Sequence, residues 1–398
     1  MKKIHFALCS ILLLASCGGG SSGDEGKNYI ASFKNAYDAS YSSGSYYFSC
    51  PNGMKFASGI RSQNDTYYHL SGSGLTFEAG VKGVKGSGAS DLKGQLLLTG
   101  GDIKLETDST KIPSSFSSLL KINDVKAKAY FDGSAVYFNA SGENKGKETN
   151  STLGLLAQTA IREITGDSSY NLYGGGDTWE TKNRYKGKWT LKDADKQKIS
   201  DKMPLVKEGD TLSEYFSLSS FLEGAYEDSE GKTAFSFSTK DDGTKRISFD
   251  TKDKNVLTAA LTAGFASFSG TIDTSESIPS ADEVKSKIEE FFTYASIKTF
   301  NVIALFSDSE LQQVTYDVNF ELNKTKIEET YPEGMIDLSA NASEGSDAKD
   351  YIFNLDGSLS ITGTVLCNFG DDDSFSLPDL SDYLEFPEIT MDSGETEE

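Results

Sequence analysis

Histidine and cysteine are scarce in this 398-residue chain, which contains two histidines and four cysteines. His69 is the only histidine beyond the first 16 residues, and no Gly-x-Ser-x-Gly segment supplies a nucleophile for a Ser-His-Asp triad. Zinc sites draw on clusters of histidine and cysteine, and the sequence has none. We therefore expect a protein that is not an enzyme and that holds no metal and no cofactor.

Positive charge is also scarce, because 38 Lys and Arg residues stand against 60 Asp and Glu residues, a formal net charge of −22. Such a surface repels a phosphate backbone, so we expect no nucleic-acid partner. The acidic run Asp371-Asp372-Asp373 could offer oxygen ligands to calcium, but it lacks the spacing of an EF-hand loop. A solvated acidic loop is the favoured interpretation of that run.

Long hydrophobic runs are missing as well. The apolar stretch from Phe6 to Leu14 is much shorter than the roughly 20 residues that cross a bilayer, and Lys2 and Lys3 precede it. Together with the ending Leu14-Ala15-Ser16-Cys17, this pattern resembles the lipobox of bacterial lipoproteins. The resemblance implies cleavage after residue 16 and lipidation of Cys17.

The same resemblance implies a location. We expect the protein to lie in the cell envelope, lipid-anchored to a bacterial membrane, so that its first partner is the membrane itself. Gly18 follows the cysteine where an aspartate would signal inner-membrane retention, which favours the outer membrane or the cell surface.

The lipobox resemblance and the composition together divide the chain into four segments. We expect a signal peptide over 1–16, a lipidated cysteine with a flexible Gly/Ser tether over 17–27, a β-rich domain over 28–388 and a disordered acidic tail over 389–398. A Lys/Asp-rich stretch over 192–210 is the best candidate for an internal boundary. A single elongated domain is favoured over two, because no internal repeat is apparent.

Two cysteines remain within the domain, Cys50 and Cys367. In an exported chain a pair of this kind indicates a disulfide, and two separate buried thiols are the alternative. Sequence alone does not decide between them, because the bond depends on the distance between the two Cβ atoms.

Alternating apolar and polar residues predict antiparallel strands in six regions, namely 96–106, 125–139, 233–250, 297–322, 335–342 and 359–369. Asp132-Gly133 and Asp242-Gly243 each stand between apolar residues, which predicts tight hairpins. Asp356-Gly357 repeats the same signal.

Helices are predicted at four places. The clearest follows Pro279, where Ser280 and Glu283 have the spacing of a capping box and the helix is expected to run to about Ser296. Weaker patterns predict helices over 29–41, 152–164 and 212–226. The helix that begins after Ser280 has one apolar face. We expect this face, made by Val284, Ile288, Phe291 and Phe292, to form the wall of an apolar ligand cavity.

These elements define an α+β fold with a large, curved antiparallel sheet, an open half-barrel with a few helices packed on its concave face. The strand pair over 129–138, the segment 185–189 and the long strand pair over 300–322 give the chain a weak resemblance to the LolA/LppX-like lipoproteins. That resemblance implies a half-barrel whose concave face is apolar and, in some members, carries lipids or lipoproteins.

Aromatic residues are plentiful in the first half of the chain. Among them are Tyr46, Tyr47, Phe48, Tyr67, Tyr68, Tyr170, Tyr173, Trp179, Tyr185 and Trp189. Aromatic rows on one face of a sheet can line a groove for a sugar, a peptide or an acyl chain. The alternative is that they fill the core and form cross-strand pairs.

Two functions remain open from the sequence. The first is a lipid-anchored envelope lipoprotein that binds or carries an apolar ligand, such as a lipid, between sheet and helices. The alternative is a structural or surface-exposed lipoprotein that contacts other envelope proteins and binds no small molecule.

Overall fold

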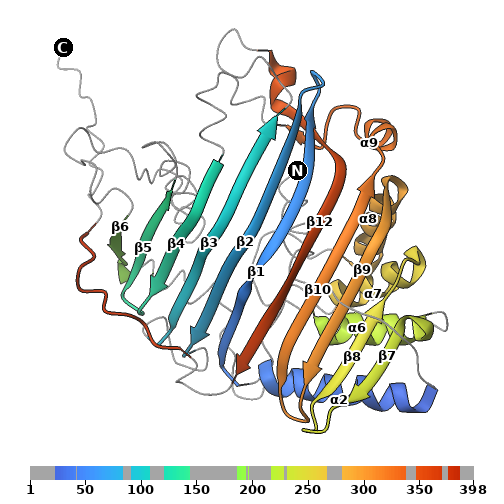
Figure 1. Cartoon of the computed structure of the whole chain (residues 1–398), viewed down its shortest axis with the longest axis horizontal. Coiled ribbons are helices and arrows are strands. Elements are labelled where there is room, and N and C mark those ends of the chain that lie inside the picture. Colours follow the sequence, from blue (N-terminus) through green and yellow to red (C-terminus); the bar gives the residue numbers. More distant parts are fainter. Residues whose placement is uncertain are drawn as a thin grey trace.

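A single large antiparallel sheet dominates the computed structural model (Figure 1). The structure describes residues 23–41, 43–83, 91–107, 121–143, 186–193, 196, 217–227, 231–266, 280–337, 347–369 and 375–385. The strands are β1 (Ser45–Ser62), β2 (Tyr67–Lys82), β3 (Lys93–Thr107), β4 (Lys121–Phe131), β5 (Ala135–Glu143), β6 (Lys186–Thr190), β7 (Phe235–Thr239), β8 (Lys245–Asp250), β9 (Ala295–Phe306), β10 (Leu311–Leu322), β11 (Ile336–Asp337) and β12 (Ile352–Phe369).

The strand order places the first and the last long strand of the chain side by side. It runs β6-β5-β4-β3-β2-β1-β12-β10-β9-β8-β7, with β11 paired to β12. The last long strand thus lies between the first strand and β10, and Phe48 of β1 stands opposite Cys367 of β12. Strands from both sides of the candidate boundary at 192–210 belong to this one sheet.

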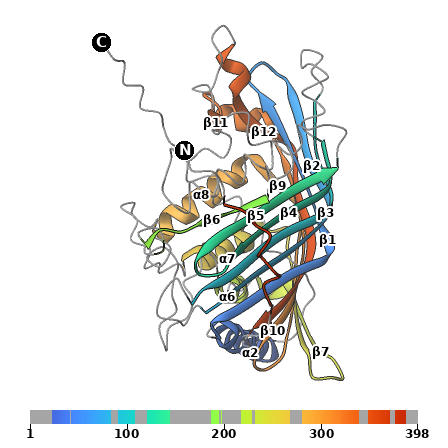
Figure 2. The ribbon, with the colours of Figure 1, turned by 90° about the vertical axis from the view of Figure 1, so that its left-hand side faces the viewer.

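The described helices lie on one face of the sheet, and Figure 2 shows them on its concave side. They are α2 (Gly23–Tyr41), α6 (Leu218–Glu227), α7 (Lys254–Ala266), α8 (Ala281–Tyr294) and α9 (Lys324–Thr330), with short 3-10 turns at Gly231–Ala234 and Ala348–Tyr351. The predicted α+β half-barrel with helices on its concave face is confirmed.

Apolar residues alternate with more exposed ones along the strands, which explains why helices pack on one face of the sheet. In β9, Phe300, Val302, Ala304 and Phe306 point to the helices and are all buried. Phe33 of α2 packs edge-on against Phe306, with the ring centroids 5.2 Å apart. The residues between them face the opposite side, as expected for a strand with one face in the core.

Local signals placed several elements where the sequence predicted them. Ser280 caps α8, its hydroxyl accepts from the backbone N–H of Glu283, and the Glu283 carboxylate accepts in return from the backbone N–H of Ser280. Asp132-Gly133 joins β4 to β5, and Asp242-Gly243 joins β7 to β8. Both glycines have a positive φ, as such turns require.

Other expectations need correction. Helix α2 begins at Gly23, inside the range expected to be the flexible tether. Gly26 is buried against the ring of Tyr226, where a side chain would collide, so this glycine serves close packing. Asp356-Gly357 makes no hairpin and lies inside β12 beside the register shift at Ser58 and Gly59 of β1. A bulge satisfies the positive φ of Gly357 without ending the strand.

Long strand β1 and helices α7 and α9 were not expected from the sequence, and the described part of the helix predicted over 212–226 is α6, from Leu218 to Glu227. The helix predicted over 152–164, the acidic run 371–373, most of the 192–210 stretch, the signal peptide and the acidic tail lie outside the described residues. Among the described helices, none is long and apolar enough to cross a membrane.

Candidate functional site

The concave faces of β2, β3, β4 and β5 present side chains that the helices leave partly open. We call this set the apolar patch; it comprises Phe77, Ala79, Val81, Leu96, Leu98, Ala127, Ala129, Phe131, Val136 and Phe138. All of these residues are half-buried or exposed. The same face of β9 and β10, under the helices, is buried.

Leu96 is the most exposed member of the apolar patch. Its exposed fraction is 58%, high for a leucine on the core-facing side of a sheet. Its lateral neighbours in register are Ala79 and Ala129, whose methyl groups cannot shield a leucine. Leu96 therefore projects above its surroundings and offers contact to an apolar ligand.

The four residues expected to line a cavity lie elsewhere on the concave face. On α8, Ile288 and Phe292 are buried, whereas Val284 and Phe291 are half-buried. Phe291 packs edge-on against Phe320 of β10, with the ring centroids 5.2 Å apart. These side chains attach α8 to the sheet, and none of them lines either of the two pockets described below.

On the opposite side of α8, the side chains of Lys285 and Lys287 are exposed to solvent. Glu290 is half-buried instead, because its carboxylate accepts a hydrogen bond from the Tyr331 hydroxyl at 2.5 Å. Burial raises the pKa of Glu290, but the hydrogen bonds from Lys287 and Tyr331 outweigh it and leave the pKa below its ordinary value.

A buried hydroxyl lies on the same concave face as the apolar patch, across β1 and β12 from it. Tyr316 of β10 is 2% exposed, and within the part of the chain that the structure describes its hydroxyl has no hydrogen-bond partner. The ring lies over Gly363 of β12, where an added Cβ would be 2.6 Å from the hydroxyl oxygen. Burial, with a smaller contribution from Cys50, raises the pKa of Tyr316 well above its ordinary value.

Cys50 and Cys367 are on neighbouring strands and carry free thiols. Cys367 stands opposite Phe48, so Cys50, two residues further along β1, is its diagonal neighbour on the same face. Diagonal neighbours in a sheet are roughly 7–8 Å apart, slightly beyond the usual reach of a disulfide. Burial raises the pKa of both thiols, that of Cys367 to about 12.

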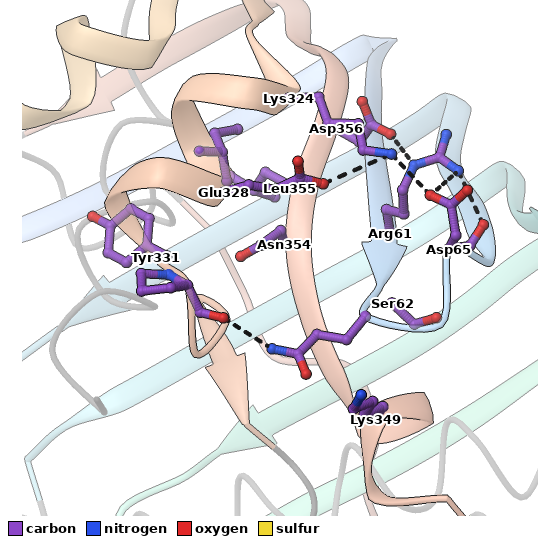
Figure 3. Close-up of a pocket in the computed structure, with 13 residues that line it drawn as sticks. Arg61, Ser62, Asp65, Lys324, Glu328, Tyr331, Lys349, Asn354, Leu355 and Asp356 are labelled. Atoms are coloured by element: carbon purple, nitrogen blue, oxygen red, sulfur yellow. Dashed lines mark hydrogen bonds and ion pairs between the residues drawn. The ribbon is translucent and has the colours of Figure 1, made fainter.

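A polar pocket of about 230 Å³ lies at the end of the sheet where the β1–β2 hairpin meets α9 and β12 (Figure 3). Arg61 bonds to the carboxylates of Asp356 and Asp65, and Lys324 Nζ lies 2.8 Å from Asp65 Oδ1. The hydrogen bond from Lys324 holds the pKa of Asp65 below its ordinary value. These ion pairs connect the β1–β2 hairpin to α9 and β12. Because carboxylates neutralise Arg61 and Lys324, the two side chains offer little net charge to a ligand.

Metal-ligating side chains do not cluster in the part of the chain that the structure describes. His69 Nδ1 is 3.9 Å from a carboxylate oxygen of Glu106 on β3, an interaction of two partly exposed side chains. No group of three His, Cys, Asp or Glu residues is placed to bind a metal within these described ranges. Cys17 lies outside them.

Comparison of the whole chain with models of known families, with curated proteins and with solved structures found no match. The resemblances to the lipobox and to the LolA/LppX-like lipoproteins therefore remain predictions. The arguments below depend on the geometry of this chain alone.

Neither the apolar patch nor Leu96 can be recognised as a site from the sequence. The run Leu96-Leu97-Leu98 marks an apolar strand, but three consecutive leucines do not show which of them faces a core. The structure divides them, with Leu97 on the convex face among Tyr130, Tyr137 and Tyr383, and Leu96 on the concave face.

Proposed function

We propose that this protein is a lipid-anchored envelope lipoprotein that holds an apolar ligand, such as an acyl chain, on the concave face of its half-barrel. The observation that carries the proposal is the 58% exposure of Leu96 at the centre of the apolar patch. Contiguous exposed apolar surface of this kind marks a site for a ligand, a partner or a membrane.

Hydrophobic burial supplies the driving force. Covering a fully exposed leucine contributes about 1.5–3 kcal/mol, so a ligand that covers the open part of Leu96 gains about 1–2 kcal/mol from this side chain. Half-buried Phe77, Phe131 and Phe138 on the same face add further apolar area. An extended acyl chain can contact several of these side chains along the sheet.

The anchor explains where such a ligand would be found. The few residues between Cys17 and the start of α2 at Gly23 can span at most about 20 Å. A lipid attached to Cys17 would therefore keep the domain close to the bilayer. Acyl chains of that bilayer are then the nearest apolar ligands.

Binding is tested with a fluorescent fatty acid and by native mass spectrometry of the purified protein for co-purified lipid. Leu96→Asn should weaken fatty-acid binding about tenfold or more, because it removes apolar contact and places an amide against the acyl chain. Leu366→Asn is the matched control, since Leu366 is 41% exposed and lies on the convex face of β12.

Equal losses in the two variants, or no saturable binding of any acyl ligand, would contradict the proposal. The alternative function, a structural lipoprotein that acts through contacts with envelope proteins, would then be favoured. In a separate experiment, Cys17→Ser should move the protein from the membrane fraction to the soluble fraction. A variant that stays in the detergent phase would refute the lipid anchor.

A further inference from the structure

The segment 375–385, which we call the C-terminal strap, crosses the convex face of the sheet from β1 and β2 to β6 (Figure 1). At its start the ring of Phe375 lies on Gly80 of β2, where an added Cβ would be 2.7 Å from the ring. The Phe375 ring also stacks near Tyr47, with centroids 6.3 Å apart and planes inclined by 22°. Lys82 Nζ donates to the Phe375 carbonyl at 3.1 Å.

The far end of the C-terminal strap also contacts the sheet. Tyr383 packs edge-on against Tyr130 and Tyr137, with centroid distances of 6.5 Å and 5.5 Å. The backbone N–H of Lys188 in β6 donates to the Leu384 carbonyl at 2.8 Å, so the strap extends the edge of the sheet. Both ends are thus fixed, and the strap and the sheet enclose a groove between them.

This groove, the strap groove, has a volume of about 360 Å³, within the range of small-molecule sites. Its walls include the rings of Tyr47, Phe375 and Tyr130, and its polar side chains include Glu78 and Gln95. Glu78 Oε2 accepts a hydrogen bond from the Tyr47 hydroxyl at 2.8 Å. Burial, followed by that hydrogen bond, raises the pKa of Tyr47 to about 12, so the hydroxyl stays protonated.

Unused hydrogen-bonding capacity remains in the strap groove. Among the described residues, Glu78 Oε1 and the side-chain amide of Gln95 have no hydrogen-bond partner, although both side chains are half-buried. A carboxylate accepts hydrogen bonds, and an amide both donates and accepts them. The groove therefore combines aromatic surface with acceptors and a donor at its base.

The chemical groups in the strap groove limit the class of ligand that it can bind. An acyl chain would bury Glu78 Oε1 and the Gln95 amide without partners, at a cost of several kcal/mol. Repulsion from Glu78 disfavours an anion. On the Phe375 ring a cation would meet like charge, because Lys82 Nζ lies 5.4 Å from the centre of that ring. A neutral ring that carries many hydroxyl groups on an apolar face satisfies every group present.

We propose that the strap groove binds a neutral saccharide. Its sugar ring packs on Tyr47 and Phe375, and its hydroxyl groups donate to Glu78 and exchange hydrogen bonds with Gln95. This site lies on the opposite face of the sheet from the apolar patch, so it does not depend on the function proposed above. Gln95 and Leu96, adjacent in β3, point to the two different faces.

The full-length protein in detergent is titrated calorimetrically with maltotriose, chitotriose and choline chloride, and is co-sedimented with isolated peptidoglycan. We expect saturable binding of a trisaccharide or of peptidoglycan, and no binding of choline. Binding of the free sugars would identify a soluble saccharide as the ligand. Binding of the polymer alone would identify a wall glycan.

Two variants test the residues. Gln95→Leu should weaken saccharide binding at least tenfold, and Gly80→Ala should do the same by displacing Phe375. Gln313→Leu is the matched control, because Gln313 of β10 faces the convex side and is not part of the strap groove. Circular dichroism shows whether each variant is folded. Choline binding, failure of every saccharide to bind, or undiminished binding by folded Gln95→Leu would overturn the proposal.

Discussion

Removal of the Tyr316 hydroxyl should make the protein more stable. Most Tyr→Phe changes in a core remove a hydrogen bond, but this hydroxyl has none among the described residues and its side chain is 2% exposed. A hydroxyl buried without a partner costs about 1–3 kcal/mol in proteins. Phenylalanine retains the ring that packs over Gly363, so Tyr316→Phe should raise the free energy of unfolding by about 1–2 kcal/mol.

Tyr331→Phe is the matched control for this change. The Tyr331 hydroxyl donates to the Glu290 carboxylate at 2.5 Å, a hydrogen bond to a charged group. Such bonds contribute about 1.5–3 kcal/mol, so the control substitution should lower the free energy of unfolding by about that amount. Removal of a tyrosine hydroxyl is thus expected to change the free energy of unfolding in opposite directions at the two positions.

Urea unfolding followed by circular dichroism measures both effects. Small proteins lose about 1–3 kcal/mol of stability per molar urea, and larger chains lose more. The midpoint of Tyr316→Phe should therefore rise by about 0.3–0.6 M, with an unchanged slope. A lowered midpoint at constant slope would show that the hydroxyl has a partner in the native protein, and would refute the reasoning.

Three further outcomes are expected. Gly363→Ala should lower the unfolding free energy by about 1–3 kcal/mol, because its Cβ would be 2.6 Å from the Tyr316 oxygen, and pairing it with Tyr316→Phe should recover part of that loss. Burial raises the pKa of Asp132, but hydrogen bonds from Tyr137 and from the turn outweigh it and leave the pKa below its ordinary value. The ionised Asp132 therefore stabilises the folded protein above a pH of about 3.9, and this stabilisation is lost as the pH falls through the folded-state pKa. Asp132→Asn should abolish this pH dependence in acid-unfolding curves. Cys50 and Cys367 should both alkylate after unfolding under non-reducing conditions, because their diagonal separation of roughly 7–8 Å is slightly beyond the reach of a disulfide; one cross-linked peptide pair in a non-reducing digest would contradict this expectation.

Exposed Leu96 and buried Tyr316 illustrate how a site escapes sequence analysis. Both lie in strands that the alternation pattern predicted, 96–106 and 297–322. Their roles depend on what faces them across the sheet, alanines for Leu96 and glycine for Tyr316. Those neighbours are brought together by register, which no short segment encodes.

The sequence by itself determined the features whose causes are local. Asp132-Gly133 and Asp242-Gly243 specify hairpins because their backbone conformations suit the turn, and Ser280 with Glu283 begins α8 because the two residues satisfy each other's backbone N–H groups. Alternation of apolar and polar residues determined that the sheet is antiparallel and covered on one face.

Only the tertiary structure decided how distant segments meet. Insertion of β12 between β1 and β10, the bulge at Gly357 and the position of the C-terminal strap all arise from pairing across hundreds of residues. Such contacts are selected by the total area buried and by the hydrogen bonds satisfied in the whole molecule, not by the propensity of any segment. For that reason the apolar patch and the strap groove emerge only when the strands are placed side by side.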